Sequence, residues 1–489
     1  MKTRRVFDVA VLGGSTGALV AACLLRKKGY KVVHVEHDGL AGLYHHAGRA
    51  LPVAPEFLPL PRRSPVMAEV LDTLSLVADS GRLLRALPAL QILTPGRRFS
   101  LPFEPEKQRA ELSREFGEEL GARAAERIAA LLHADAETSK LLAEHPPLPP
   151  DGLFERRALK RLGDTVPDTA PSFEGLPELE TLFAGLERLG SYLHTEAPSP
   201  LQRLRSVAGL LQGVVRGTAE LEPGGYASLL RRRFESLGGV RAGGNKGIVE
   251  SIGVKSGRID VIEVLDDNTE YHPRFVVSGL EVAALRRLLP LDSRRRKFDA
   301  RLGSVRPREL LFSLNLVLKA GKLPLGLADA ALYLPRENGA LDGEVLLLER
   351  FPEAGGEGEE VLQISTFVPA SRREQGRPFF EQEEARLLDL LRSDLLPFLD
   401  EHLVATSAPI LEDGESRGSR LNPWPRLETD LGLSLGVGLL PPSTPYKNLI
   451  LAGRENVPGL GLEGEFLAGH RAARLVAEQA KRHDPLKGS

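Results

Sequence analysis

The first 38 residues switch between apolar runs and a glycine-rich turn in an order that predicts strand, helix and strand. Residues 6–14, VFDVAVLGG, are almost wholly apolar, which is typical of a strand in the middle of a parallel sheet. Small and apolar residues continue at helical spacing through 15–29, and a second apolar run covers 30–38. This order is the βαβ context that a dinucleotide-binding fold requires.

Two later segments support the same interpretation. Residues 222–280 begin with a Gly-Gly turn and an amphipathic helix, and then alternate apolar and polar positions in runs that predict a β-meander. Residues 448–482 combine a buried strand, a Gly/Pro loop and a long Ala-rich helix. The unpaired N–H groups and positive dipole at the start of that helix would face an anion or a polar cofactor.

The turn after the first strand departs from the dinucleotide fingerprint G-x-G-x-x-G at two positions. Ser15 takes the place of the second glycine and puts a side chain where the phosphates would lie. Ala18 takes the place of the third and adds a methyl group where the helix packs on the strand. Glu36 follows Ala18 at nearly the distance where an acid reaches a ribose hydroxyl, which favours FAD or NAD over NADP.

The same opening can also be interpreted as a lipoprotein export signal, with the basic start MKTRRVFD, an apolar run and the ending VAAC at Cys23. Asp8 interrupts that apolar run, and LLRKKG follows Cys23 in place of a flexible polar tether. Cleavage before Cys23 would also remove the strand and turn that complete the cofactor domain. We therefore expect Cys23 to be a buried helix residue.

Size and composition narrow the class of protein. The chain has 489 residues, of which 42% are hydrophobic and 27% charged, so we expect a soluble globular protein with two or more domains. The formal net charge of -2 gives no global attraction to nucleic acid. A single cysteine excludes a disulfide framework and a thiolate metal cluster, and fits a reducing, cytoplasmic location. No apolar run reaches the roughly 20 residues that cross a bilayer.

Five segments resemble the FAD-dependent phytoene desaturases and their wider amine-oxidase-like relatives. These are VLGGSTGALVAACLLRKKGYKVVHVE at 11–36, GLAGL at 39–43, GRRFSLPFEPE at 96–106, GGYASLLRRRFESLGGVR with VESI within 224–252, and NLILAGRENVPGLGLEGEFLAGHRAA at 448–473. The resemblance runs from end to end and is loose over about 110–215. It implies an α/β fold with two domains. The discontinuous Rossmann-type FAD-binding domain takes residues 1–100, 216–300 and 425–489, and a second α+β substrate or cap domain takes 101–215 and 301–424.

The resemblance also implies elements and site residues. The second domain would hold strands at 309–320, 330–335, 344–351 and 360–369, and a strongly periodic helix at 381–403. It assigns cofactor contacts to Gly13, Gly14, Ser15, Gly17 and Ala18 at the FAD pyrophosphate, Glu36 at the adenosine ribose, Gly42 in the GLAGL segment, Val249 at the adenine through its backbone, and Gly453, Arg454, Gly461 and Leu462 at the ribityl chain and flavin ring. No catalytic side chain and no metal ligand are assigned.

Three departures from the family all fall at the cofactor. Ser15 replaces a glycine, and Arg454 stands where many relatives have an acid that binds the ribityl hydroxyls. The planar fork of Arg454 could instead pair with the pyrophosphate. Residues 53–65, VAPEFLPLPRRSP, lack the aromatic-Asp-x-Gly element that approaches the flavin ring in relatives.

These features predict an FAD-dependent oxidoreductase that desaturates or saturates a lipophilic, isoprenoid- or carotenoid-like skeleton, with an amine substrate as a variant. The three departures support an alternative, a degenerate flavin-fold protein with a non-catalytic binding or assembly role. The expected partner is a lipophilic small molecule and not nucleic acid. Basic clusters at 62–65 and 294–297 beside apolar helices would allow peripheral contact with the inner membrane. The oligomeric state is left open.

The remaining candidates are interpreted as structural. His45 and His46 are adjacent, so on a strand they point apart and cannot easily share a metal. His272 and His470 are taken as incidental to chemistry. Trp424 and Tyr446 precede the last motif and are assigned to core packing, with lining of the substrate side as the alternative.

Overall fold

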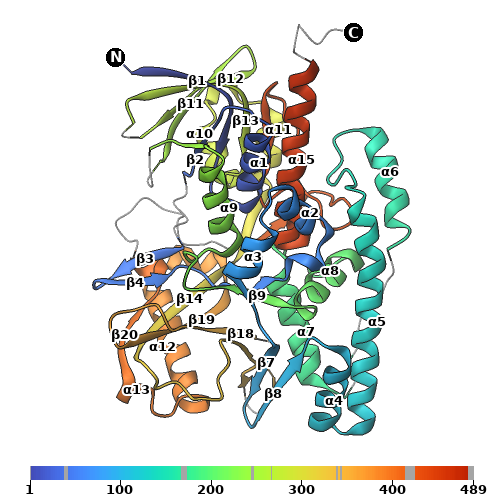
Figure 1. Ribbon diagram of the computed structural model, residues 1–489, viewed down its shortest axis with the longest axis vertical. Helices are drawn as coiled ribbons and strands as arrows, with labels where there is room; N and C mark the ends of the chain where they lie inside the picture. Colours follow the sequence, from blue (N-terminus) through green and yellow to red (C-terminus); the bar gives the residue numbers. More distant parts are fainter. Residues whose placement is uncertain are drawn as a thin grey trace.

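The computed structural model describes residues 2–37, 42–166, 173, 175–243, 247–265, 267–337, 340–341, 344–412 and 425–482. It contains two large sheets with helices packed against them, and the N- and C-terminal segments lie beside the same sheet (Figure 1). The predicted α/β fold is therefore confirmed. The expectations for Gly39–Ala41 and for Trp424 lie outside the described residues.

The first sheet is built from three distant parts of the chain. Its strands are β1 (Thr3–Leu12), β2 (Val32–Val35), β10 (Val240–Arg241), β11 (Val249–Lys255), β12 (Arg258–Val264), β13 (Thr269–Ser278) and β22 (Leu449–Leu451). The order is β10-β2-β1-β13-β12-β11, with β22 paired to β13. Strand β1 pairs in parallel with both β2 and β13, whereas β11, β12 and β13 form the predicted antiparallel meander.

Three helices pack together beside this sheet, namely α1 (Thr16–Lys27), α9 (Gly225–Ser236) and α15 (Gly461–Arg482) (Figure 1). Cys23 is fully buried in α1, as predicted, and its thiol donates to the carbonyl oxygen of Leu230 at 3.2 Å. The second half of strand β1, residues 7–12, is largely buried in the centre of the sheet. The opening of the chain is thus part of the core.

The second sheet is largely antiparallel. Its order is β20-β14-β19-β18-β15-β7-β8, with β21 paired to β14. The strands are β7 (Ala89–Thr94), β8 (Arg97–Pro102), β14 (Val305–Lys319), β15 (Ala330–Tyr333), β18 (Leu346–Phe351), β19 (Glu359–Pro369), β20 (Leu403–Ser407) and β21 (Arg426–Thr429). The four strands predicted between 309 and 369 are all present, because alternating apolar side chains bury both faces of this sheet.

The helix predicted at 381–403 is wrong in extent. Helix α12 (Arg377–Asp394) packs on one face of the second sheet and ends before Pro397. Proline has no N–H to continue the helical hydrogen bonds, so the chain restarts as the short α13 (Leu399–His402) and then enters β20. The other face of the sheet is covered by α5 (Glu118–Ala143), α7 (Pro177–Gly190) and α8 (Pro200–Leu211).

Shorter elements connect these layers. They are β3 (Leu43–His46), β4 (Arg49–Pro52), β5 (Leu58–Pro59), η1 (Pro61–Arg63), α2 (Pro65–Thr73), α3 (Val77–Leu83), β6 (Leu84–Ala86), α4 (Pro105–Phe116), α6 (Leu153–Gly163), β9 (Val214–Gly217), α10 (Val282–Leu288), η3 (Leu291–Ser293), α11 (Arg296–Gly303), β16 (Arg336–Glu337), β17 (Ala340–Leu341), η4 (Ala370–Gln375), α14 (Pro409–Glu412) and η5 (Pro458–Leu460). None of the helices within the described ranges has the length and apolar character needed to span a bilayer.

Candidate functional site

The carboxyl end of β1 meets the start of α1 at the place where ligands bind in open α/β sheets. Gly13 has a φ of +94°, and a Cβ there would lie 2.6 Å from the carbonyl carbon of Gly279. A Cβ on Gly17 would lie 2.3 Å from the carbonyl oxygen of Ala452. Both glycines are therefore required by the close crossing of three backbone segments, whether or not a cofactor binds.

A cavity of about 100 Å³ opens beside this crossing. We call it the cofactor cleft, and it is lined by Gly14, Ser15, Thr16, Gly42, Val53, Ala54, Pro55, Glu56, Leu58, Tyr192, Gly224, Gly225, Tyr226, Ala227, Arg454, Leu462 and Glu465. The structure thus brings together the predicted residues Gly14, Ser15, Gly42, Arg454 and Leu462. The other predicted residues, which are Gly13, Gly17, Ala18, Glu36, Val249, Gly453 and Gly461, are not among those that line the cavity.

The N-terminus of α1 is capped by the chain's own oxygens. The hydroxyl of Ser15 accepts from the backbone N–H of Ala18 at 3.2 Å. The carboxylate of Glu465, on α15, accepts from the backbone N–H of Gly17 at 3.3 Å and is 2% exposed. Backbone N–H groups and a positive dipole make this helix end a natural anion site. Here a buried carboxylate of the chain accepts from one of these N–H groups.

The N-terminus of α9 is capped in the same way by Glu56. Its carboxylate accepts from the N–H of Gly224 at 2.7 Å and of Gly217 at 3.0 Å. Burial raises the pKa of Glu56 against the opposing effect of these N–H groups and Arg216. Glu56 lies in residues 53–65, the segment that lacks the family's aromatic-Asp-x-Gly element. Its carboxylate therefore ties this segment to the start of α9.

A second buried acid, Glu349 on β18, binds the backbone of Glu56. Its carboxylate accepts from the backbone N–H of Glu56 at 2.8 Å and lies 3.1 Å from Nε of Arg216. Burial raises the pKa of Glu349 to about 7.

Gly42 lies close to the turn before α9, since a Cβ on Gly42 would lie 1.6 Å from the carbonyl oxygen of Pro223. The backbone beside the GLAGL segment therefore touches the turn that leads into α9.

The two groups predicted to bind the adenosine part of FAD, Glu36 and the backbone of Val249, bind other side chains of the protein. The carboxylate of Glu36 binds Nη2 of Arg231 at 2.6 Å and Nη2 of Arg241 at 2.9 Å. Burial raises the pKa of Glu36, but the two guanidinium groups outweigh it and hold the pKa below its usual range. The backbone N–H of Val249, predicted to bind adenine, donates to Nδ1 of His37 at 3.0 Å.

Arg454 lies among acids. Its guanidinium is buried and sits 5.2 Å from the centre of the Tyr192 ring, which is a cation–π distance. Burial lowers its pKa, but nearby groups with Glu465 foremost outweigh this effect and raise it. Glu455 is next in the chain; burial raises its pKa to about 7, and it accepts from the N–H of Val282 at 3.2 Å. Arg454 thus lies among carboxylates of the chain, and its pairing with a pyrophosphate stays a prediction.

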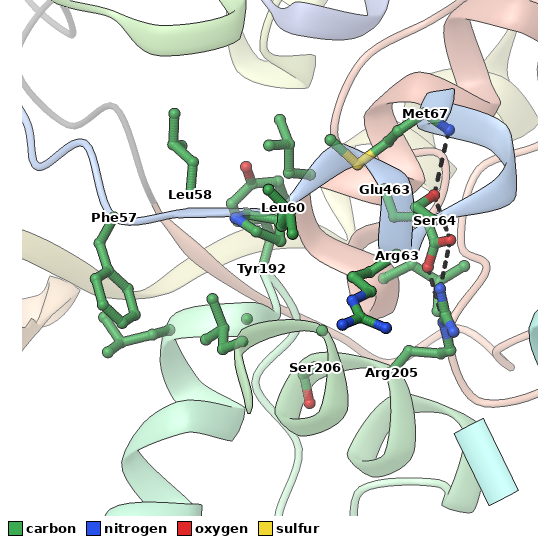
Figure 2. A pocket seen from close by; sticks show the side chains of 17 residues that line it. Phe57, Leu58, Leu60, Arg63, Ser64, Met67, Tyr192, Arg205, Ser206 and Glu463 are labelled. Atoms are coloured by element: carbon green, nitrogen blue, oxygen red, sulfur yellow. Dashed lines mark hydrogen bonds and ion pairs between the residues drawn. The ribbon is translucent and has the colours of Figure 1, made fainter. Parts of the chain in front are cut away.

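A smaller cavity of about 50 Å³ lies next to the cofactor cleft (Figure 2). Glu463 at its wall accepts from the hydroxyl of Ser64 at 2.6 Å and from Nη2 of Arg205 at 2.7 Å. Nη1 of Arg205 also binds Asp135 at 2.6 Å. This buried network joins α2, α5, α8 and α15, and so fixes the start of α15 against the helices that cover the second sheet.

These residues do not fit FAD in the position that the resemblance implies. Sites for drug-sized ligands usually measure about 300–1,000 Å³, whereas the cleft holds about 100 Å³. FAD is larger than such ligands and carries an anionic pyrophosphate, which at the start of α1 would meet the carboxylate of Glu465. FAD in the predicted position would have to displace Glu465 from the N–H of Gly17 and His37 from the N–H of Val249. The assigned roles of Glu36, Val249 and Arg454 therefore stay predictions.

Sequence reasoning missed the groups that fill the cleft. Glu465 lies within residues 448–473, which resemble the family, and Glu56 lies within residues 53–65, which depart from it. Two acids at 463 and 465, near the start of a predicted helix, are the available signal. Of the other candidates, His46 lies 2.9 Å from Glu412, while His45 is exposed. Tyr446 is 2% exposed and packs in the core as predicted.

Comparisons with solved structures show which known fold this chain has. No protein-family model matches the chain, and no curated protein matches it. Among solved structures, an oxidoreductase from Methanosarcina mazei is similar, with a TM-score of 0.57 and 15% identity over 95% of this chain and 99% of that one. Putrescine oxidase bound to putrescine gives 0.57 and 16% over 97% and 100%. Cyclohexylamine oxidase from Brevibacterium oxydans gives 0.55 and 15% over 97% and 100%. The chain has the amine-oxidase-like flavoprotein fold, which is a fold of oxidoreductases.

Proposed function

We propose that this chain uses the amine-oxidase-like fold as a binding or assembly protein, with a cofactor cleft that its own side chains keep closed. The observation that carries the proposal is the contact between the Glu465 carboxylate and the N–H of Gly17. An internal anion at this helix end supplies the negative charge that a bound pyrophosphate would otherwise bring.

Electrostatics supports the closed state. Glu465 is buried and is foremost among the groups that favour the charged form of the buried Arg454, so its removal from this position would weaken that stabilisation and leave the Gly17 N–H without this acceptor. An unsatisfied buried polar group costs about 1–3 kcal/mol, and more when it is charged. A second anion placed beside Glu465 would add repulsion in a region of low dielectric.

A second candidate is an FAD-dependent oxidoreductase acting on a lipophilic, isoprenoid- or carotenoid-like substrate, in the cytoplasm or at the inner membrane surface. Its support is the likeness in fold to oxidoreductases over nearly the whole length of each chain. When bound, a flavin supplies redox chemistry, and the protein supplies orientation and exclusion of water. In this candidate Glu465 and His37 must leave the contacts described above.

The visible absorption spectrum separates the two candidates. The full-length protein is purified with FAD added during growth and lysis, and is then titrated with FAD. We expect a colourless protein that takes up no FAD. A yellow protein with stoichiometric flavin contradicts the closed-cleft proposal and supports the oxidoreductase.

A matched pair of variants then tests whether any bound flavin lies in the family position. Glu36 and Glu235 both bind Arg241, at 2.9 and 2.8 Å, but only Glu36 is assigned to the ribose. If FAD binds there, Glu36→Gln weakens it and Glu235→Gln does not. Equal affinity in both variants places the flavin elsewhere.

A further inference from the structure

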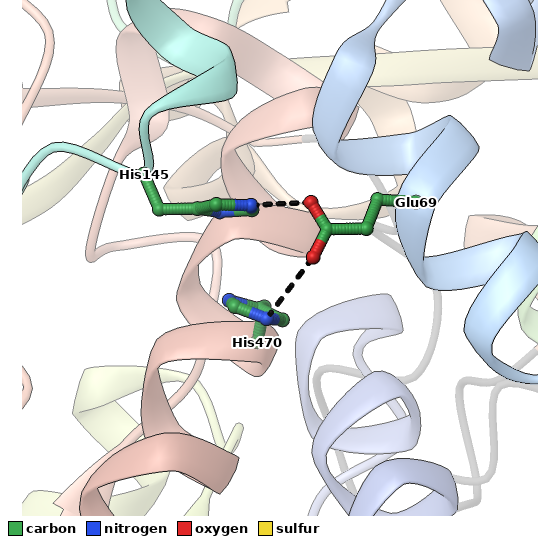
Figure 3. A group of neighbouring side chains, drawn as sticks. All are labelled: Glu69, His145 and His470. Carbon is green, nitrogen blue, oxygen red and sulfur yellow. Dashed lines mark hydrogen bonds and ion pairs between the residues drawn. The ribbon is translucent and has the colours of Figure 1, made fainter.

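Two histidines and a glutamate from distant parts of the chain meet outside the cofactor cleft (Figure 3). Glu69 lies on α2, His145 follows the end of α5, and His470 lies on α15. No sequence pattern groups them, since His470 is separated from His145 by more than 300 residues. Helix α2 packs against both α5 and α15, which brings the three residues together.

The three side chains lie close together. Nε2 of His145 lies 2.5 Å from Oε2 of Glu69, and Nε2 of His470 lies 4.0 Å from Oε1 of Glu69. The two imidazole rings stack with centroids 4.4 Å apart and planes 25° apart. One ligand atom from each residue lies within 4.8 Å of the other two. Figure 3 shows the carboxylate directed toward both rings.

We propose that Glu69, His145 and His470 bind a divalent transition metal, with Zn²⁺ as the best match. Two imidazole nitrogens and one carboxylate oxygen are a donor set that Zn²⁺ accepts, with a water in the fourth position. A metal gives both rings and the carboxylate a common partner. The proposal is independent of the function of the cofactor cleft.

Binding requires side-chain rotation, because the stacked imidazole planes differ by only 25° and one ring must turn before both Nε2 atoms can face one ion. Zn–N and Zn–O bonds of about 2.0–2.2 Å in a tetrahedron separate neighbouring ligand atoms by about 3.3 Å. The Glu69–His145 contact must therefore widen slightly and the Glu69–His470 contact must shorten. The Glu69 side chain is 50% exposed and can rotate, whereas the side chains of His145 and His470 are 17% and 24% exposed. Arg474, one turn further along α15, binds Glu478 at 2.9 Å.

Isothermal titration calorimetry tests the site. The full-length protein is stripped with a chelator and titrated with Zn²⁺, and we expect one tight ion per chain. Glu69→Gln, His145→Gln and His470→Gln should each weaken binding by at least about 10- to 100-fold, a loss that even groups behind the ligands produce. His133→Gln is the control, because His133 is exposed on α5 outside the cluster. Unchanged affinity in the three variants, or no stoichiometric binding to the wild type, overturns the proposal.

Co²⁺ provides a measurement on the wild type that does not depend on variants folding. Four-coordinate Co²⁺ gives intense visible bands, and six-coordinate Co²⁺ gives weak ones. We expect intense bands that Zn²⁺ abolishes, together with a rise in Tm on adding Zn²⁺, because a ligand that binds the folded state stabilises it. A weak six-coordinate spectrum overturns the assignment.

Discussion

Removing Arg205 should destabilise the protein strongly, because this side chain balances two buried acids. The side chains of Arg205, Asp135 and Glu463 are 3%, 2% and 9% exposed, and the guanidinium lies 2.6 and 2.7 Å from the two carboxylates. Breaking a buried ion pair by removing one partner costs about 3–5 kcal/mol. The carboxylates keep one neutral donor each, from Gln212 and Ser64 at 2.6 Å. For Arg205→Met we therefore expect a loss of about 4 kcal/mol in the free energy of unfolding.

Urea denaturation followed by circular dichroism measures this loss. Arg203→Met on the same helix is the control, since Arg203 is 31% exposed and lies 3.8 Å from Glu187, and it should change stability by less than about 0.5 kcal/mol. Replacing Asp135 and Glu463 by leucine together with Arg205→Met should restore most of the stability, because no unpaired charge is then buried. A loss below about 1 kcal/mol for Arg205→Met would refute the reasoning.

Three further predictions concern the cleft. Ser15→Ala should lower the free energy of unfolding by about 1 kcal/mol through loss of the α1 cap, and Ser15→Gly by only a few tenths, as measured in urea. Gly279→Ala should reduce the yield of folded protein in a solubility assay, since its Cβ would lie 2.2 Å from Oγ of Ser15; normal yield would contradict the close crossing. The pKa of Glu349 is raised from 4.5 to about 7, so its contribution to stability is greatest below pH 4.5 and falls as the pH rises to 7, by up to about 3 kcal/mol. Glu349→Gln should flatten the pH dependence of the urea midpoint over that range, and an unchanged slope would exclude this residue as its source.

Local patterns were enough to predict the opening βαβ unit and the meander of the first sheet, whereas four strands of the second sheet were predicted from the family resemblance. Apolar runs and glycine turns located β1, α1 and β2 because these elements are fixed by short-range periodicity and by burial. The predicted helix at 381–403 extended past the end of α12, because the helical spacing of apolar residues continues through Leu395 and Leu396. Pro397 lacks the N–H that would continue the helical hydrogen bonds.

The contents of the cleft could not be predicted in the same way. The partner of the Gly17 N–H is Glu465, which is 448 residues away, and the partner of the Val249 N–H is His37. Such pairs depend on how helices from distant segments converge, and a single sequence carries no direct signal for that. The cluster at Glu69 was missed for the same reason.

The crossing at Gly13 and Gly17 has a consequence for motif-based annotation. A side chain at position 13 would clash with the backbone of Gly279, and one at position 17 with the backbone of Ala452. Folding alone therefore requires both glycines. A fingerprint of this kind then survives after ligand binding is lost, and a search for it retrieves proteins with and without a nucleotide. Under the closed-cleft proposal, the informative positions are 56 and 465, where a carboxylate accepts from backbone N–H groups at a helix end.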